Sequence, residues 1–193
     1  MKAALALEGS TRRRIGPAWR WLIGLAATGL LAVALPAGPV EALEASVKAA
    51  YIYKLLPYVD WPPASFANAD APQVIGVMSG DAVHAELEQL VAERRVNGRA
   101  LVVRKVAPGD SLEGVHVLYL GRSARAPAMM PLVAGKPILI ITDAPAGLAE
   151  GGAINFILVD GRVRFEAAPA AAERSGLRLS SRLLAVAERV VAP

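Results

Sequence analysis

Two carboxylates, Asp143 and Glu166, come closest to a catalytic or binding pair in this chain. Each lies at the end of an apolar run that is typical of a strand, and α/β proteins bind ligands at the carboxyl edge of the sheet. If such a ligand binds, Asp143 and Arg178 are the candidate residues. The pattern favours a structural explanation, in which Asp143 caps a loop and Glu166 pairs with Arg164 or Arg178.

The other chemistry-bearing residues form no catalytic or metal-binding set. The two histidines, His84 and His116, fall on a predicted helix and a predicted strand, with no acid or second histidine at ligand spacing. The chain has no Gly-x-Ser-x-Gly motif, no glycine-rich dinucleotide fingerprint and no P-loop lysine. It has no cysteine, which excludes disulfides, thiolate metal sites and cysteine nucleophiles. We therefore predict that the protein is not an enzyme and holds no metal and no cofactor.

The segments that position these residues alternate between strand-like and helix-like patterns. The predicted strands are 74–78, 100–106, 115–120 and 138–141. The predicted helices are 44–58, 82–95 and 122–134. Asp160-Gly161 joins two further apolar-rich runs, 153–159 and 162–165, into a hairpin. We therefore predict an α/β fold, a three-layer sandwich whose mainly parallel sheet carries an antiparallel edge hairpin and flanking helices.

The ends of the predicted helices are marked by residues that start, stop or cap them. Pro169 stands where a helix would begin, Gly176 where it would end, and Ser180 where the next helix would be capped. In the helix at 44–58, the apolar stripe contains Val47, Ala50, Tyr51, Leu55 and Tyr58. This stripe predicts packing against the sheet, and the alternative is an aromatic surface for a partner that includes Tyr51 and Trp61.

The first forty or so residues resemble an export signal rather than part of the fold. Four arginines precede the apolar run 21–35, which is shorter than the span of about 20 residues that a membrane helix needs. We predict a signal peptide at 1–42 that is cleaved after Ala42, and cleavage after Ala37 is the alternative. The other possibility is that this segment is not cleaved and anchors the protein in the membrane as a single helix. A single domain at 43–193 follows. The chain's 21 basic and 17 acidic residues become 16 and 15 after cleavage, so nothing in its charge indicates nucleic-acid binding.

Two segments of the chain together resemble the YfiR family of exported bacterial proteins. The first is Lys48-Ala49-Ala50-Tyr51-Ile52-Tyr53 followed by Trp61-Pro62. The second contains Gly151-Gly152-x-Ile154-x-Phe156, Val163-Arg164-Phe165-Glu166, Gly176-Leu177-Arg178-Leu179-Ser180-Ser181, Leu183-Leu184 and Ala187. The order and spacing of these motifs cover nearly the whole predicted mature chain.

The resemblance implies a periplasmic α/β domain that is not an enzyme and that forms a homodimer. Founding members of the family restrain an inner-membrane diguanylate cyclase by binding its periplasmic sensor region, which lowers cyclic-di-GMP and thereby affects biofilm formation and motility. An outer-membrane lipoprotein relieves this restraint. In other members the partner is expected to be another membrane cyclase or a sensor kinase.

This chain departs from the family pattern in two ways. It lacks the cysteines that many members carry, so control through their disulfides is excluded. Ala167-Ala168 also replace an Ile-Asn pair that usually follows Phe-Glu, which removes an amide that could cap the next helix.

Our leading hypothesis is a periplasmic protein that binds the sensor region of a membrane signalling enzyme. The expected partner surface is an exposed patch at the hairpin, formed by Phe156, Arg164 and Glu166, with Tyr51 and Trp61 as a second candidate surface. The alternative is a small-ligand-binding domain that resembles one lobe of a periplasmic solute-binding protein, although the chain is too short for the second lobe.

Overall fold

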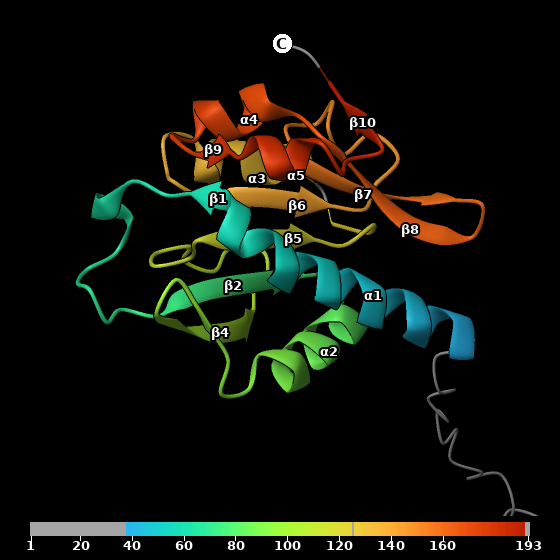
Figure 1. Ribbon diagram of the computed structural model, residues 1–193, viewed down its shortest axis with the longest axis horizontal. Helices are drawn as coiled ribbons and strands as arrows, with labels where there is room; N and C mark the ends of the chain where they lie inside the picture. Colours follow the sequence, from blue (N-terminus) through green and yellow to red (C-terminus); the bar gives the residue numbers. More distant parts are fainter. Residues whose placement is uncertain (1–37, 125, 192–193) are drawn as a thin grey trace, which may run out of the picture. The chain divides into compact units, whose positions relative to one another are not determined.

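The computed structural model describes residues 38–124 and 126–191, in which an eight-stranded sheet is the central element (Figure 1). In spatial order its strands are β10 (Arg189–Val190), β8 (Arg162–Ala167), β7 (Ile154–Val159), β6 (Leu139–Thr142), β5 (Val117–Leu120), β2 (Gln73–Met78), β4 (Arg99–Lys105) and β3 (Arg95–Val96). The five strands from β7 to β4 are mutually parallel, and β7–β8 and β3–β4 are antiparallel hairpins. The prediction of a mainly parallel α/β sheet is confirmed.

The parallel strands are wound in two directions from β2. β2 pairs on one side with β4 and on the other with β5, and β6 and β7 then follow beyond β5. The resulting order, β4-β2-β5-β6-β7, is that of doubly wound sheets of the flavodoxin type. Because the winding reverses between β2 and β5, the carboxyl ends of these two strands form the topological switch point, where such sheets bind ligands.

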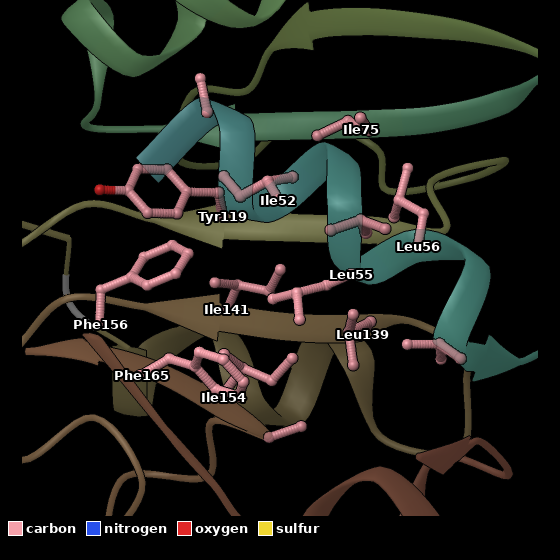
Figure 2. Close-up of a cluster of buried hydrophobic side chains, with 14 of the residues drawn as sticks. Ile52, Leu55, Leu56, Ile75, Tyr119, Leu139, Ile141, Ile154, Phe156 and Phe165 are labelled. Atoms are coloured by element: carbon pink, nitrogen blue, oxygen red, sulfur yellow. The ribbon is translucent and has the colours of Figure 1, made fainter. Parts of the chain in front are cut away.

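Helices cover both faces of the sheet, which makes a three-layer sandwich. All side chains of β5 and β6 are buried, as expected for strands that are covered on both sides. One apolar cluster lies between the sheet and two helices, α1 (Pro39–Leu55) and α2 (Asp81–Val91), and Figure 2 shows its centre. A second cluster, on the opposite face, includes the buried residues of α3 (Ala126–Val133).

The buried stripe of α1 differs from the predicted one. Its buried apolar residues are Ala45, Ala49, Ile52 and Leu55, whereas the predicted Tyr58 is 41% exposed. The α-helix ends at Leu55 and continues as the 3₁₀ turn η2 (Leu56–Tyr58), which rotates Tyr58 away from the sheet. Of the predicted stripe, Leu55 is buried and Val47 and Tyr51 pack against the core, so the prediction of a packing face is confirmed in part.

The hairpin at Asp160-Gly161 is confirmed, but it is not the edge of the sheet. Asp160 and Gly161 have φ angles of 49° and 70°, as the type I′ turn requires. β10 pairs with β8 and forms the edge on that side. On the other side of the sheet, Asn97-Gly98 forms a second turn of this kind, which our sequence analysis did not identify.

The last part of the chain wraps back toward the residues that follow α1. Pro169 begins α4 (Pro169–Arg174), and the Ser180 hydroxyl accepts a hydrogen bond from the Leu183 amide, so it caps α5 (Ser181–Leu184) as predicted. Between these helices, β9 (Arg178–Leu179) pairs with β1 (Val59–Asp60) in a small antiparallel sheet. A 3₁₀ turn, η3 (Pro63–Ser65), follows β1.

Most of the predicted signal peptide lies outside the described residues. The favoured cleavage point after Ala42 falls inside α1, near its start, whereas the alternative after Ala37 immediately precedes Gly38, where the described residues begin. Within the described part of the chain, no helix combines the length and apolar character that a membrane span needs.

Candidate functional site

A cleft of about 510 Å³ opens at the switch point of the sheet. Its walls are the segments that follow β2, β5 and β6, together with the amino-terminal half of α1 and the start of α2. The polar side chains that matter for its chemistry are Glu44, Lys48, Ser79, Tyr119, Arg122 and Asp143.

Lys48 is the most deeply buried charged residue of the cleft. Its Nζ lies 2.5 Å from Asp143 Oδ2 and 2.6 Å from Glu44 Oε1. Lys48 is 6% exposed and Asp143 is 8% exposed, so this ion pair is shielded from water and from salt. Because Glu44 and Lys48 stand one helical turn apart, α1 presents both to the carboxyl edge of the sheet.

Tyr119 lies between the apolar core and the charged cluster that Glu44, Lys48 and Asp143 form. Its ring lies in the core near Phe156, with 6.4 Å between ring centroids, and Figure 2 shows its hydroxyl pointing away from the apolar side chains. Burial, followed by the nearby charge of Asp143, raises the pKa of Tyr119 above its ordinary value. The phenol therefore stays protonated and can donate a hydrogen bond at physiological pH.

The backbone at the switch point is tightly packed and partly strained. A Cβ atom on Gly121 would overlap the carbonyl group of Ser79, and one on Gly80 would lie 2.6 Å from the Tyr119 ring. Ser79 has a φ of 54°, in the left-handed region that few non-glycine residues adopt. Such strain tends to occur at binding sites.

The structure does not bring together the predicted ligand residues Asp143 and Arg178. Asp143 follows β6 at the carboxyl edge, whereas Arg178 lies opposite Asp60 in the strand register of the small sheet. Trp61, next to Asp60, donates a hydrogen bond to the carbonyl of His116, just before β5 begins. Arg178 therefore belongs to the amino edge, at the opposite end of the parallel strands.

Asp143 and Glu166 form no carboxylate pair, because each has its own cation. Asp143 binds Lys48, while Glu166 Oε1 accepts a hydrogen bond from Arg189 Nε at 2.7 Å and forms an ion pair with Arg189 Nη2 at 2.6 Å. The expectation that Arg164 or Arg178 would pair with Glu166 is wrong, because Arg189 of β10 lies directly beside Glu166 in the sheet register.

The predicted partner patch at the hairpin is only partly exposed. Phe156 is 3% exposed and packs in the core, so its prediction as a surface residue is wrong. Arg164 is exposed and Glu166 is half-buried. Phe156 is buried because its side chain lies on the sheet face that α1 covers, near Tyr51.

Tyr51 and Trp61 are both half-buried. The Tyr51 ring packs against Phe156 and Phe165, with centroids 5.9 and 5.8 Å away. The Trp61 indole donates to the His116 carbonyl at 3.3 Å. Packing therefore accounts for most of the surface of both side chains.

His116 is a structural residue at the amino edge. Its Nδ1 accepts a hydrogen bond from the Val74 amide at 3.1 Å, so Nε2 carries the proton and donates to the Ser65 carbonyl at 3.0 Å. The ring stacks on Phe66, with 4.4 Å between centroids, and burial lowers the pKa of His116. His84 instead lies 3.3 Å from Glu88 Oε2, so the expectation that no acid stands at ligand spacing is wrong for this histidine: Glu88 follows it by one helical turn. No group of three potential metal ligands occurs among the residues that the structure describes.

Sequence reasoning missed Lys48, Glu44, Tyr119 and Arg189. A local signal existed for one pair, since Glu44 and Lys48 have the i, i+4 spacing of a helical ion pair. The contact of Lys48 with Asp143 joins residues 95 positions apart, and no local pattern predicts it.

The comparisons with known proteins agree with the resemblance seen in the sequence. A family model described as YfiR/HmsC-like matches residues 45–188, well over half of the chain. None of the curated proteins matches. A crystal structure titled as a conserved domain protein from Vibrio cholerae matches with a TM-score of 0.48 and 16% identity, over 79% of this chain and 60% of that one. The chain thus spans less than two thirds of that protein. The match of the family model shows that the chain belongs to the YfiR/HmsC-like family.

Proposed function

We propose that this protein is a periplasmic regulator that restrains an inner-membrane diguanylate cyclase by binding the cyclase's periplasmic sensor region. Membership of the YfiR/HmsC-like family, whose members are periplasmic regulators rather than enzymes, is the observation that carries this proposal. Binding would lower cyclic-di-GMP. We further propose a homodimer and an outer-membrane lipoprotein that relieves the restraint, and a sensor kinase as the alternative membrane partner.

The arm of the β7–β8 hairpin, residues 157–164, is the surface that best fits a protein partner. β6 pairs only with Ile154 and Asn155 of β7, so the rest of the hairpin extends beyond its neighbour (Figure 1). Arg162 and Arg164 are exposed on one face of the arm. Ile157 and Val159 lie opposite them in the register and are half-buried. Arginine beside apolar residues is a composition typical of protein interfaces.

A charge reversal at Arg164 tests this surface. We expect Arg164→Glu to reduce capture of the cyclase by crosslinking in the periplasm by about tenfold or more, and to raise cyclic-di-GMP, without changing thermal unfolding. Arg182→Glu, at another exposed arginine, is the matched control and should leave capture unchanged. If capture and cyclic-di-GMP are the same in both variants, the arm is not the partner surface.

A charge exchange separates direct contact by Glu166 from its bond to Arg189. Both Glu166→Lys and Arg189→Glu break that ion pair, and the double variant restores it in the opposite sense. If Glu166 contacts the partner, the double variant remains defective in capture. Recovery of capture by the double variant would mean that Glu166 only holds β10 in place.

Crosslinking that captures the protein itself and no cyclase or kinase would overturn the proposed function.

A further inference from the structure

The charges of the ion-pair cluster in the switch-point cleft, in which Lys48 and Asp143 are buried and the Glu44 side chain is 24% exposed, do not balance. Glu44 and Asp143 carry two negative charges, and Lys48 supplies one positive charge between them. The other lining charges lie at the exposed rim, where Asp81 is 2.8 Å from Lys105, and Glu41 and Arg122 have opposite signs. The cluster of Glu44, Lys48 and Asp143 therefore has one negative charge in excess.

Asp143 also has an unused hydrogen-bonding atom. Its Oδ2 contacts Lys48, and the Tyr119 hydroxyl lies beside the carboxylate, but Oδ1 is buried and has no hydrogen-bond partner among the described residues. The side chain is 8% exposed, so water reaches it poorly. An unpartnered oxygen on a buried carboxylate is costly, because the lost hydration is not replaced. Oδ1 itself therefore lacks a positively charged donor.

The location of the cleft supports a ligand independently of its charge. It lies where β2 and β5 diverge in the winding order, at the position where doubly wound sheets bind small molecules. Its volume of about 510 Å³ is within the usual range for small-molecule sites. The left-handed Ser79 and the close approach of Gly121 hold the two strand ends in position.

We propose that this cleft binds a small organic cation, a primary ammonium compound, whose charged group neutralises Glu44 and Asp143. This goes beyond the regulator function, because the site needs no protein partner. An ammonium group has three N–H donors, enough for the two carboxylates and the Tyr119 oxygen. A metal ion fits less well, because the described residues offer no cluster of three metal-binding side chains. Glu44, Lys48 and Asp143 follow both predicted cleavage points, so the mature protein keeps them.

Three probes of similar size and different charge test the proposal on the protein purified from its own periplasm. They are n-butylammonium, n-butanol and n-butyrate. We expect n-butylammonium to raise the unfolding temperature saturably and to shift the backbone amide resonances of Gly121 and Ala144, which flank the cleft. Butanol and butyrate should do neither at the same concentrations.

Two variants locate the binding site. Glu44→Gln removes the excess charge and keeps the contact between Lys48 and Asp143, so it should fold and bind n-butylammonium at least about tenfold more weakly. Asp81→Asn is the matched control, because Asp81 lines the same cleft but is 86% exposed and pairs with Lys105. Its affinity should stay within about twofold of the original.

Several results would overturn the proposal. An equal response to butanol would mean that the cleft takes up apolar molecules without regard to charge. A stronger response to butyrate would mean that Lys48 and Arg122 dominate and that the site binds anions. No saturable response to n-butylammonium, or equal weakening by the two variants, would show that the charged cluster is purely structural. None of these results bears on capture of the cyclase, so the regulator function is tested separately.

Discussion

The two edges of the parallel sheet bury titratable groups in different ways. At the amino edge, His116 is neutral and both ring nitrogens are hydrogen-bonded, one with the Val74 amide and the other with the Ser65 carbonyl. At the carboxyl edge, Lys48 is shared between two carboxylates, and one Asp143 oxygen has no partner among the described residues. The His116 ring is fully hydrogen-bonded, whereas the carboxyl edge leaves a charge and a charged acceptor unsatisfied. Ser65 Oγ and Gln73 Nε2 at the amino edge also lack partners among the described residues, but both groups are neutral.

Fold stability alone explains the buried histidine at the amino edge, but it does not explain the charged cluster at the carboxyl edge. A neutral histidine with satisfied hydrogen bonds stabilises the fold at little electrostatic cost. A buried cluster with an excess charge stabilises a fold less well than apolar packing would, so its presence at a switch point favours a binding role. Variants at each edge can break or sharpen this comparison.

The largest effect is expected at the carboxyl edge, from Lys48→Met. The variant leaves Glu44 and Asp143 close together with no internal cation, which should lower the free energy of unfolding by about 3–5 kcal/mol. Urea unfolding measures this, with the exposed Lys54→Met in the last turn of the same helix as control. Adding Asp143→Asn to Lys48→Met should recover part of the loss. Equal stability of the two lysine variants would contradict the importance of the cluster.

A smaller effect is expected at the amino edge, from His116→Phe. The apolar ring keeps the stacking on Phe66 but leaves the Val74 amide and the Ser65 carbonyl without their bonds, at a cost of about 1–3 kcal/mol. His116→Asn is the informative comparison, since its Oδ1 can replace Nδ1 as the acceptor for Val74. It should be the more stable of the two variants. If His116→Phe is as stable as the original protein, these hydrogen bonds contribute nothing net.

The smallest effect is a pH dependence that belongs to His116. Because burial lowers the pKa of His116 below its ordinary 6.5, the unfolded chain takes up a proton more readily than the folded chain as the pH falls. The stability contribution is therefore complete above about pH 6.5 and declines as the pH falls from there toward the folded pKa, by at most about 1.4 kcal/mol per pH unit. Urea unfolding between pH 7.5 and 5.5 should show a flatter profile for His116→Asn. Parallel profiles for the two proteins would contradict this assignment.

Local signals predicted the elements whose formation depends on neighbouring residues. The aliphatic run at 138–141 predicted β6, Asp160-Gly161 predicted the hairpin turn, and Ser180 predicted a helix cap. The turn at Asn97-Gly98 carried an equally strong local signal that we did not use. The two-residue strands β1, β9 and β10 had no such signal, because only their tertiary partners define them.

The site was harder to predict than the fold. Phe156 and Arg164 stand in the same hairpin, yet one is in the core and the other is in solvent, since alternate strand residues face opposite sides of the sheet. Applying that alternation strictly would have placed Phe156 with Phe165 on the inner face. Lys48 could not be placed in this way, because a lysine in an amphipathic helix is ordinarily solvated and only the fold brings Asp143 to it.

The bond between Lys48 and Asp143 can form only when the chain as far as β6 is present. The two residues are 95 positions apart, and a growing chain exposes α1 long before β6 has been made. Until β6 docks beside β5, the Lys48 ammonium has no buried acceptor on the sheet, and closing so long a loop is slow. Lys48 therefore reaches its final environment only after β6 has docked, and a chain that ends before β6 cannot form the complete cleft.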